Sequence, residues 1–362
     1  MVEFERVYRM LNISFDSYLG ESFYRSRVPA LVEKLKERTL LTESQGANIV
    51  DLSAYNMPPC LITKKDGGSI YHSRDIAAIL YRKEQYDFEK CLYVTWLEQS
   101  LHFKQVFKTI ELMGYDWYDG LVHIPYGLVS LDGAKLSTRN GNIIYAEDIL
   151  NEAVKRAAEL IHEKNPALSN QEEVAQIVGV GAVIFHDLFH QRMKNVDFKW
   201  KDVLSFDGTT GPYVQYTYAR AKSILRKSQC VVNDIEQTDD AEQTNYAEQV
   251  DQVKQLGHAE YASLVNSVDY EALTDDYTFG LIKTLSEYGD TVKKAAEQYE
   301  PSVIARYIIS VAAAFNRFYQ ACPILREEKE NIRNARLFVV DMVQRILKDA
   351  CGLLGVKCPE EM

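Results

Sequence analysis

The apolar run Cys91-Leu92-Tyr93-Val94-Thr95-Trp96 decides the fold, because its length and its aromatic and β-branched residues are typical of a buried strand. Apolar residues at helical spacing follow it and predict a helix that Gly114 ends. A further strand is expected over residues 121–130, and a helix over residues 146–163. This alternation of strands and helices indicates a parallel sheet wound with helices.

The segments upstream predict a hairpin and a helix. Extended runs over residues 60–63 and 69–71 flank Asp66-Gly67-Gly68, and Asp-Gly between such runs favours a tight turn. Ser73 is expected to cap the helix that follows, whose apolar residues recur at helical spacing. The opening residues, to about residue 48, are also expected to be helical.

Beyond Gln171 the pattern changes to an all-helical one. We expect the start of a separate helical domain at Phe206-Asp207-Gly208-Thr209-Thr210-Gly211-Pro212, where small residues and a proline interrupt the helical pattern. The predicted fold class is therefore α/β plus all-α. The helices are predicted over residues 172–190, 213–227, 246–268, 279–299, 302–319 and 332–354.

Composition excludes several classes of protein. A formal net charge of -11 argues against a protein that coats nucleic acid through bulk electrostatics. Part of that charge lies in residues 228–253, which contain no Lys or Arg and which we interpret as a solvated segment. The six cysteines lack metal-ligand spacing, so no metal site is predicted. Residues 1–20 do not resemble a signal peptide, and no run is long enough to span a membrane, so a cytoplasmic location is expected.

The loop after residue 130 predicts phosphate chemistry. It reads Asp132-Gly133-Ala134-Lys135-Leu136-Ser137-Thr138-Arg139-Asn140-Gly141-Asn142 and follows a predicted buried strand, where wound sheets place their ligands. Lys135 and Arg139 can spread charge that develops on phosphate oxygens, and Ser137 can donate a hydrogen bond. The alternative for any single short motif is a solvated surface loop.

Two helix starts carry further candidate residues. Tyr71 and Asp75 are about one helical turn apart, and a carboxylate beside a hydroxyl suits a guanidinium. The alternative is that Asp75 only charges a helix start or pairs with a nearby Arg. Gln99 and His102 begin the next helix, where His102 alone is equally well explained as a helix histidine without a ligand.

The helical domain opens with a stacking surface. Tyr213, Tyr216 and Arg220 share one helix face, which combines aromatic rings with a cation in a way that suits splayed single-stranded bases. Tyrosines at helical spacing are more often part of a core, so this alternative stays open.

Together these motifs resemble arginyl-tRNA synthetases. Lys-Leu-Ser-Thr-Arg at residues 135–139 is similar to the second signature of class I aminoacyl-tRNA synthetases, KMSKS, in its arginyl form, where Thr138 replaces a lysine. The segment from Gly211 to Arg220, residues 315–319 and 333–337, and the closing residues 353–362 resemble the anticodon-binding domain of these enzymes.

The resemblance implies a role for each matching residue. Tyr71, Asp75 and Gln99 are expected to bind the arginine substrate, and His102 to lie by ATP with Lys135 and Ser137. Lys135, Ser137 and Arg139 are the expected catalytic residues, which act by electrostatics and positioning. The expected tRNA-binding residues are Tyr213, Tyr216, Arg220 and Met362.

The resemblance also implies an architecture and its partners. A partial Rossmann-like catalytic domain is expected over residues 1–170, a helical junction over residues 171–205 and a helical-bundle anticodon-binding domain over residues 206–362. The partners are L-arginine, arginine tRNA and ATP accompanied by Mg²⁺, with no structural metal, no membrane and a monomer favoured. In the family, arginine's carboxylate attacks the α-phosphate of ATP, and the arginyl group then moves to the tRNA.

The chain departs from the family in one respect. It contains no His-x-Gly-His, which is the first class I signature. In family members this motif lies early in the nucleotide fold and binds the phosphates of ATP. We therefore interpret the chain as a carboxy-terminal part of the enzyme, with Met362 as its native end and little adenylate formation alone. Three alternatives remain: a tRNA-binding module without catalysis, a different class I enzyme such as the cysteinyl one, or a partial gene product without a role.

Overall fold

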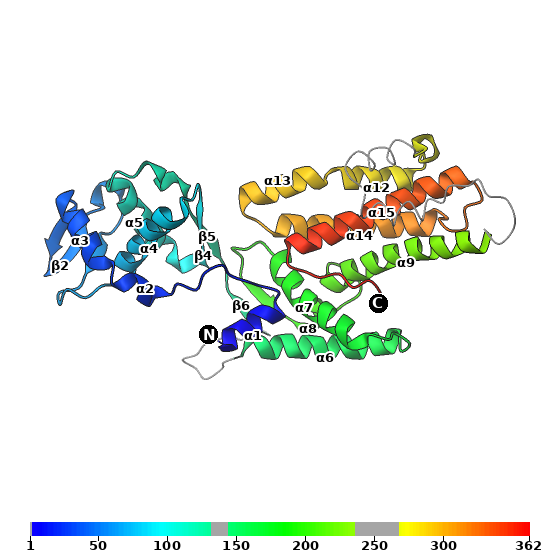
Figure 1. Cartoon of the computed structure of the whole chain (residues 1–362), viewed down its shortest axis with the longest axis horizontal. Helices are drawn as coiled ribbons and strands as arrows, with labels where there is room; N and C mark the ends of the chain where they lie inside the picture. The colour runs from blue at the N-terminus through cyan, green and yellow to red at the C-terminus, as the bar shows by residue number, and fades with distance from the viewer. Residues whose placement is uncertain (1, 132–143, 236–267) are drawn as a thin grey trace. The chain divides into compact units, whose positions relative to one another are not determined.

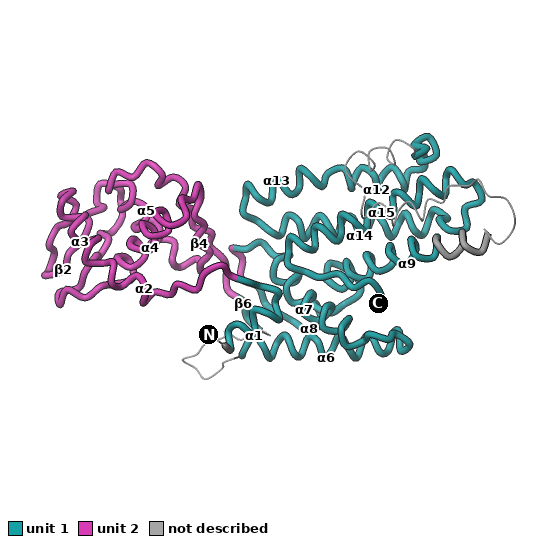
Figure 2. The backbone as a smooth tube through the Cα atoms, in the orientation of Figure 1, with its two compact units in different colours: residues 1–14, 129–192, 196–362 teal, residues 15–128, 193–195 magenta. Residues whose placement is uncertain are grey.

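The computed structural model describes residues 2–131, 144–235 and 268–362, and Figure 1 shows the order of its elements. It divides into two compact units, which Figure 2 colours separately. Unit 1 comprises residues 1–14, 129–192 and 196–362, and unit 2 comprises residues 15–128 and 193–195. Each unit is described by itself below.

Unit 2 contains an antiparallel sheet of three strands in the order β1-β2-β3. The strands are β1 (Leu41–Ser44), β2 (Ala47–Val50) and β3 (Cys60–Thr63). Helix was expected as far as residue 48, and that prediction is wrong over residues 11–20 and beyond the end of helix α3 (Val28–Glu37). Gln45 and Gly46 adopt positive φ angles of 51° and 82°, which are the angles that a two-residue hairpin turn requires.

The wound strand–helix pattern is confirmed. Helix α4 (Tyr71–Tyr86) precedes strand β4 (Cys91–Trp96), and helix α5 (Ser100–Leu112) leads to strand β5 (Leu121–Tyr126). Strands β4 and β5 are parallel, with Cys91 opposite Leu121. Gly114 has a φ of 77° and ends the α5 segment in the left-handed conformation expected of a helix terminator.

Two local predictions in this region need correction. Helix α4 begins at Tyr71 rather than after Ser73, whose hydroxyl instead bonds both backbone groups of Ile70. The strand expected over residues 121–130 is two strands, because it breaks after Tyr126. At Gly127 a Cβ atom would lie 2.4 Å from the Lys194 carbonyl oxygen, so only glycine allows this close approach.

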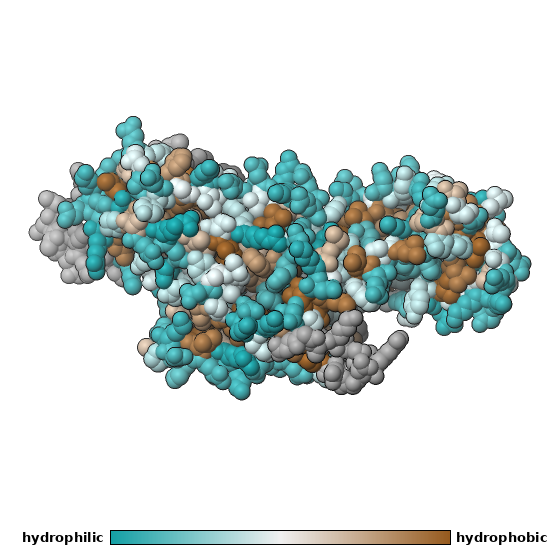
Figure 3. Space-filling view, turned by 180° about the vertical axis from the view of Figure 1, so that it is seen from behind, coloured by the Kyte–Doolittle hydropathy of each residue, from teal (hydrophilic) through white to brown (hydrophobic). Residues whose placement is uncertain are grey.

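Strand β4 is covered on one face and open on the other. Tyr93 is 8% exposed and packs with Phe103 and Phe107 of α5, whereas Val94 is 63% exposed. The prediction of a buried strand over residues 91–96 therefore holds for one face of β4 only. Figure 3 shows one side of the molecule, where patches of hydrophobic residues reach the surface between hydrophilic ones.

Unit 1 is mainly helical, as predicted. A short parallel pair, β6 (Val129–Leu131) with β7 (Val196–Phe198), accompanies the helices. The predicted helix over residues 279–299 is two helices that meet at Glu287. The helix predicted over residues 246–268 lies outside the described residues except for its last residue. The helices are α1 (Val2–Met10), α6 (Ala146–Lys164), α7 (Gln171–Phe189), α8 (Trp200–Val203), α9 (Gly211–Ile235), α12 (Asp276–Ser286), α13 (Tyr288–Gln298), α14 (Ser302–Ala321) and α15 (Glu330–Leu353).

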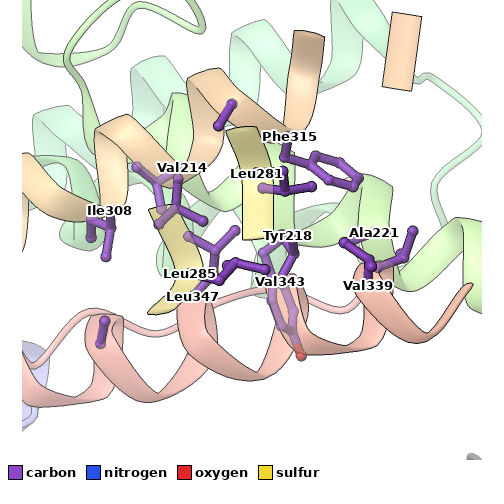
Figure 4. Packing of buried hydrophobic residues seen from close by; sticks show 14 of the residues in the cluster. Val214, Tyr218, Ala221, Leu281, Leu285, Ile308, Phe315, Val339, Val343 and Leu347 are labelled. Carbon is purple, nitrogen blue, oxygen red and sulfur yellow. The ribbon is translucent and has the colours of Figure 1, made fainter. Parts of the chain in front are cut away.

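The core of unit 1 joins α9, α12, α14 and α15. Figure 4 shows Val214 and Tyr218 of α9 among Leu281, Phe315 and Val343 from the other three helices. All five side chains are 0% exposed, and full burial of each such side chain stabilises the fold by about 1.5–3 kcal/mol. The apolar residues recur every three or four positions, so each helix presents one face to this core.

No helix within the described ranges is both long and apolar enough to cross a membrane.

Candidate functional site

Asp75 and His102 meet at the beginnings of two helices of unit 2. The His102 Nε2 atom lies 2.6 Å from the Asp75 Oδ2 atom, so the imidazole can donate a hydrogen bond to the carboxylate. The side chain of Asp75 is 39% exposed and that of His102 is 18% exposed. The carboxylate is therefore anchored on one side and still open to solvent.

Tyr71 precedes Asp75 by one helical turn and is exposed. It is the first residue of α4, and the guanidinium carbon of Arg74 lies 5.0 Å from the centre of its ring. Arg74 also forms an ion pair with Glu21, with Nε and Oε1 2.5 Å apart. Arg74, the residue before Asp75, is thus paired with Glu21. The partner of Asp75 is His102, so the alternative that Asp75 pairs with a nearby arginine is not what the structure has.

Gln99 stands directly before α5, at the residue that caps the helix, and is exposed. It lies three residues before His102, so the two belong to the same end of α5. The structure therefore brings Asp75 and His102 into contact and sets Gln99 at the end of the helix that makes this contact. Lys135, Ser137 and Arg139 lie outside the described residues.

Two residues that sequence reasoning missed lie beside this pair. The His72 Nε2 atom is 3.2 Å from Gln105 Oε1, and the rings of His72 and His102 are 4.5 Å apart. Burial lowers the pKa of His72, and so does the charge that His102 carries when it is protonated, although Gln105 and Asp75 act in the opposite direction. The sequence offered one indication of this pair, because Gln105 is a polar residue among the apolar positions of the predicted helix.

In unit 1, three of the four predicted tRNA-binding residues line one cavity of about 860 Å³. They are Tyr216, Arg220 and Met362, and Tyr319 adds a second tyrosine. The cavity is rich in cations, as expected of a site for a polyanion. Its charged lining residues are Arg220, Arg226, Lys227, Arg326 and Glu361.

Arg220 is held rigidly at this cavity. Its guanidinium carbon lies 4.7 Å from the ring centre of Tyr216 and 5.2 Å from that of Tyr319, and its Nη1 atom donates to Asn316 Oδ1 at 2.6 Å. Asn316 in turn donates to the Tyr213 hydroxyl at 3.0 Å. Tyr213, the fourth predicted residue, thus contacts the same asparagine but is not among the residues that line the cavity.

The closing residues of the chain bind along one face of α9. Gln215 donates to the Lys357 carbonyl at 2.7 Å, and the Tyr218 hydroxyl donates to Glu360 at 3.1 Å. Lys222 forms an ion pair with Glu360 at 2.9 Å, and Arg226 forms one with Glu361. Met362 then lies at the cavity and, like Phe206, packs against the edge of a core cluster that includes Phe198 and Leu204.

Within the described part of the chain, no three His, Cys, Asp or Glu side chains gather as a metal site would require. The cysteines whose side chains are described are all unpaired thiols.

Two protein-family models match the chain. The model of the class I (R) tRNA synthetase catalytic domain matches residues 1–200. The model of the DALR anticodon-binding domain matches residues 214–362. The chain belongs to the arginyl-tRNA synthetase family. The predicted fold class, a class I synthetase catalytic domain with a helical anticodon-binding domain, is thereby confirmed.

Individual relatives support the same family. The arginine–tRNA ligase of Halothermothrix orenii is 48% identical over 99% of this chain, and that of Clostridium acetobutylicum is 47% identical over the same share. The chain spans 58% of the length of each of these relatives.

Solved structures share the fold. The Thermus thermophilus arginyl-tRNA synthetase is 25% identical with a TM-score of 0.80, and the match covers 99% of this chain and 62% of that one. The Plasmodium falciparum arginyl-tRNA synthetase is 23% identical with a TM-score of 0.79, and the match covers 100% of this chain and 56% of that one.

The closing segment of the chain should loosen in acid. Burial raises the pKa of Glu360, but hydrogen bonds from Lys222 and Tyr218 and the charge of Lys222 outweigh it and lower that pKa below its ordinary value of 4.5. A carboxylate whose pKa is lowered by folding stabilises the fold above the ordinary value and loses this effect as the pH falls through the lowered one. Glu360→Gln should therefore lower the free energy of unfolding by up to about 1 kcal/mol at pH 7 and by less at pH 3.

Urea unfolding at the two pH values measures this difference, and Glu328→Gln serves as an exposed control that should change neither value. An equal effect of Glu360→Gln at pH 7 and pH 3 would contradict the assignment of the lowered pKa.

Proposed function

We propose that this chain supplies the arginine-selecting and tRNA-binding parts of an arginine–tRNA ligase, which joins L-arginine to its tRNA at the expense of ATP. One observation carries the proposal: the Asp75 carboxylate is anchored by His102 at 2.6 Å and remains 39% exposed. An anchored, open carboxylate is the acceptor that a planar guanidinium recognises. ATP would arrive with Mg²⁺, and we place the protein in the cytoplasm and favour a monomer.

The proposed roles divide between the arginine side chain and the ATP that activates its carboxylate. Asp75, Tyr71 and Gln99 receive the arginine side chain at the ends of α4 and α5. His102, which holds Asp75, also faces the nucleotide. The arginine carboxylate would attack the α-phosphate of ATP, with pyrophosphate as the leaving group, and the terminal ribose hydroxyl of the tRNA would then take the arginyl group.

The residues proposed to act on phosphate work without a covalent intermediate. Lys135 and Arg139 would offset the negative charge that grows on phosphate oxygens, and Ser137 would donate a hydrogen bond to them. We propose residues 1–170, 171–205 and 206–362 as the catalytic, junction and anticodon-binding parts of the chain.

Single-stranded RNA is the proposed ligand of the cavity in unit 1. Tyr216 and Tyr319 offer ring faces for bases, and Arg220, already aligned over both rings, offers a charge for a phosphate. Met362 adds an apolar contact at the same cavity, and Tyr213 fixes Asn316, which holds Arg220. This arrangement supports a cavity that binds unpaired bases of a tRNA.

Asp75→Asn should weaken L-arginine binding by about tenfold or more, because the guanidinium loses a charged acceptor and keeps a neutral one. Isothermal titration calorimetry of L-arginine measures the dissociation constant. Glu84→Gln, on the exposed part of the same helix, removes one negative charge away from Tyr71 and Asp75 and should leave binding unchanged. Equal binding by wild type and Asp75→Asn would sink the assignment.

Arg220→Gln should weaken binding of arginine tRNA by about tenfold and reduce its dependence on salt, because one cation at the cavity is lost. Filter binding at several salt concentrations gives both quantities. The control is Arg156→Gln on α6, since Arg156 also lies over an aromatic ring, that of Trp200 at 4.8 Å, but is not among the residues that line the cavity. If both variants behaved alike, the cavity would not be the RNA site.

The chain alone should catalyse little ATP–pyrophosphate exchange with arginine and tRNA present, because its sequence contains no His-x-Gly-His to bind the ATP phosphates. Exchange at the rate of a full-length arginine–tRNA ligase would contradict this. Binding of arginine tRNA without any binding of L-arginine would instead favour the alternative of a tRNA-binding module.

A further inference from the structure

His72 and Gln105 lie next to the Asp75–His102 pair, and the proposed function gives neither of them a role. His72 is the second residue of α4 and is half-buried. Gln105 lies one helical turn beyond His102 on α5 and is only 6% exposed. A buried amide must satisfy its donors and its acceptor within the protein, so its partners reveal how it is oriented.

The orientation of the Gln105 amide is fixed by the backbone. Its Nε2 atom donates to the Pro58 carbonyl at 2.9 Å and to the Pro59 carbonyl at 3.1 Å, which uses both of its hydrogens. A flipped amide would set its oxygen against two carbonyl oxygens. Oε1 must therefore face His72.

This orientation in turn fixes the tautomer of His72. Gln105 Oε1 can only accept, so the His72 Nε2 atom, 3.2 Å away, must carry a hydrogen. A second proton on the ring is disfavoured, because burial and the nearby His102 lower the pKa of His72. His72 is thus a neutral ring held in one tautomer and one orientation.

The fixed ring of His72 lies against His102. The two ring centres are 4.5 Å apart with an angle of 49° between the planes, and Phe103 contacts His102 at 5.0 Å and 86°. These contacts restrict the rotation of His102, whose Nε2 atom reaches Asp75. Each step in this series is a hydrogen bond or a ring contact, from the Pro58 and Pro59 carbonyls to the Asp75 carboxylate.

We propose that Gln105 and His72 are positioning residues for the arginine site: Gln105 fixes the His72 ring, and that ring holds His102 in the orientation that anchors the Asp75 carboxylate. The inference rests on the proposed function for the identity of the ligand, L-arginine, whereas the contacts from Gln105 to Asp75 do not depend on that function. Its consequence is a carboxylate that is preorganised for a guanidinium, so that less ordering is needed when the ligand binds.

The test uses ¹⁵N-histidine-labelled protein and the variants His72→Leu and Gln105→Leu. In the wild type at pH 7, the His102 ring should show a single tautomer with a hydrogen on Nε2. In both variants that signal should shift toward the averaged position of an imidazole that exchanges between its two tautomers. The dissociation constant for L-arginine should rise about tenfold, because one orienting hydrogen bond is worth roughly that factor.

A matched control is available within the chain. His162 Nδ1 also lies 3.2 Å from a glutamine oxygen, that of Gln171, but this pair is exposed and belongs to unit 1. His162→Leu should leave the His102 signal and the arginine affinity unchanged. Circular dichroism confirms which variants are folded, and the use of two variants keeps the test valid if one of them does not fold.

An unchanged His102 signal in a folded variant would overturn the inference, even if arginine binding weakened, because the loss would then have another cause. A changed signal with unchanged arginine affinity would also overturn it. If the wild type bound no arginine, the proposed function would fail, whereas the tautomer of His102 in the variants would still decide whether His72 and Gln105 hold it.

Discussion

The hydrogen bond between His102 and Asp75 joins the first turns of α4 and α5, and the candidate arginine site depends on it. Both helices pack into one apolar core, in which Ile76 and Ile79 of α4 lie with Val106 and Ile110 of α5. The core sets the distance between the helices, and the hydrogen bond of 2.6 Å sets the direction of the carboxylate. Rigid elements thus carry the polar groups, which is the arrangement that precise ligand recognition needs.

Much of this fold was predictable from periodicity. Helices α14 and α15 bury residues at regular spacing, and β4 and β5 lie on short apolar runs; both patterns are local properties of the sequence. The hairpin of β1 and β2 was missed because Gln45-Gly46 is a weak turn signal. The break at Gly127 depends on the Lys194 carbonyl, which is distant in sequence and invisible to any local pattern.

The candidate site was predictable only in part. Asp75, Gln99 and His102 were found through the family's motifs, but the contact of Asp75 with His102 joins residues 27 positions apart. The roles of His72 and Gln105 follow from the backbone carbonyls of Pro58 and Pro59, which no sequence motif identifies. The roles proposed for Lys135, Ser137 and Arg139 stay predictions.

In unit 1, a chain with a net charge of -11 still gathers cations around one cavity. Four arginines and lysines line it, and the acids of the closing segment pair with α9 beside it. Overall charge therefore says little about this local surface, since exposed charges act mainly within about 10 Å of each other at moderate salt.

The most direct test of the central claim is a crystal structure of this chain with L-arginine. The account predicts that a guanidinium nitrogen lies about 2.7–3.2 Å from an Asp75 carboxylate oxygen while His102 keeps its bond to the same side chain. Arginine bound elsewhere, or an Asp75 side chain turned away from a bound arginine, would contradict it.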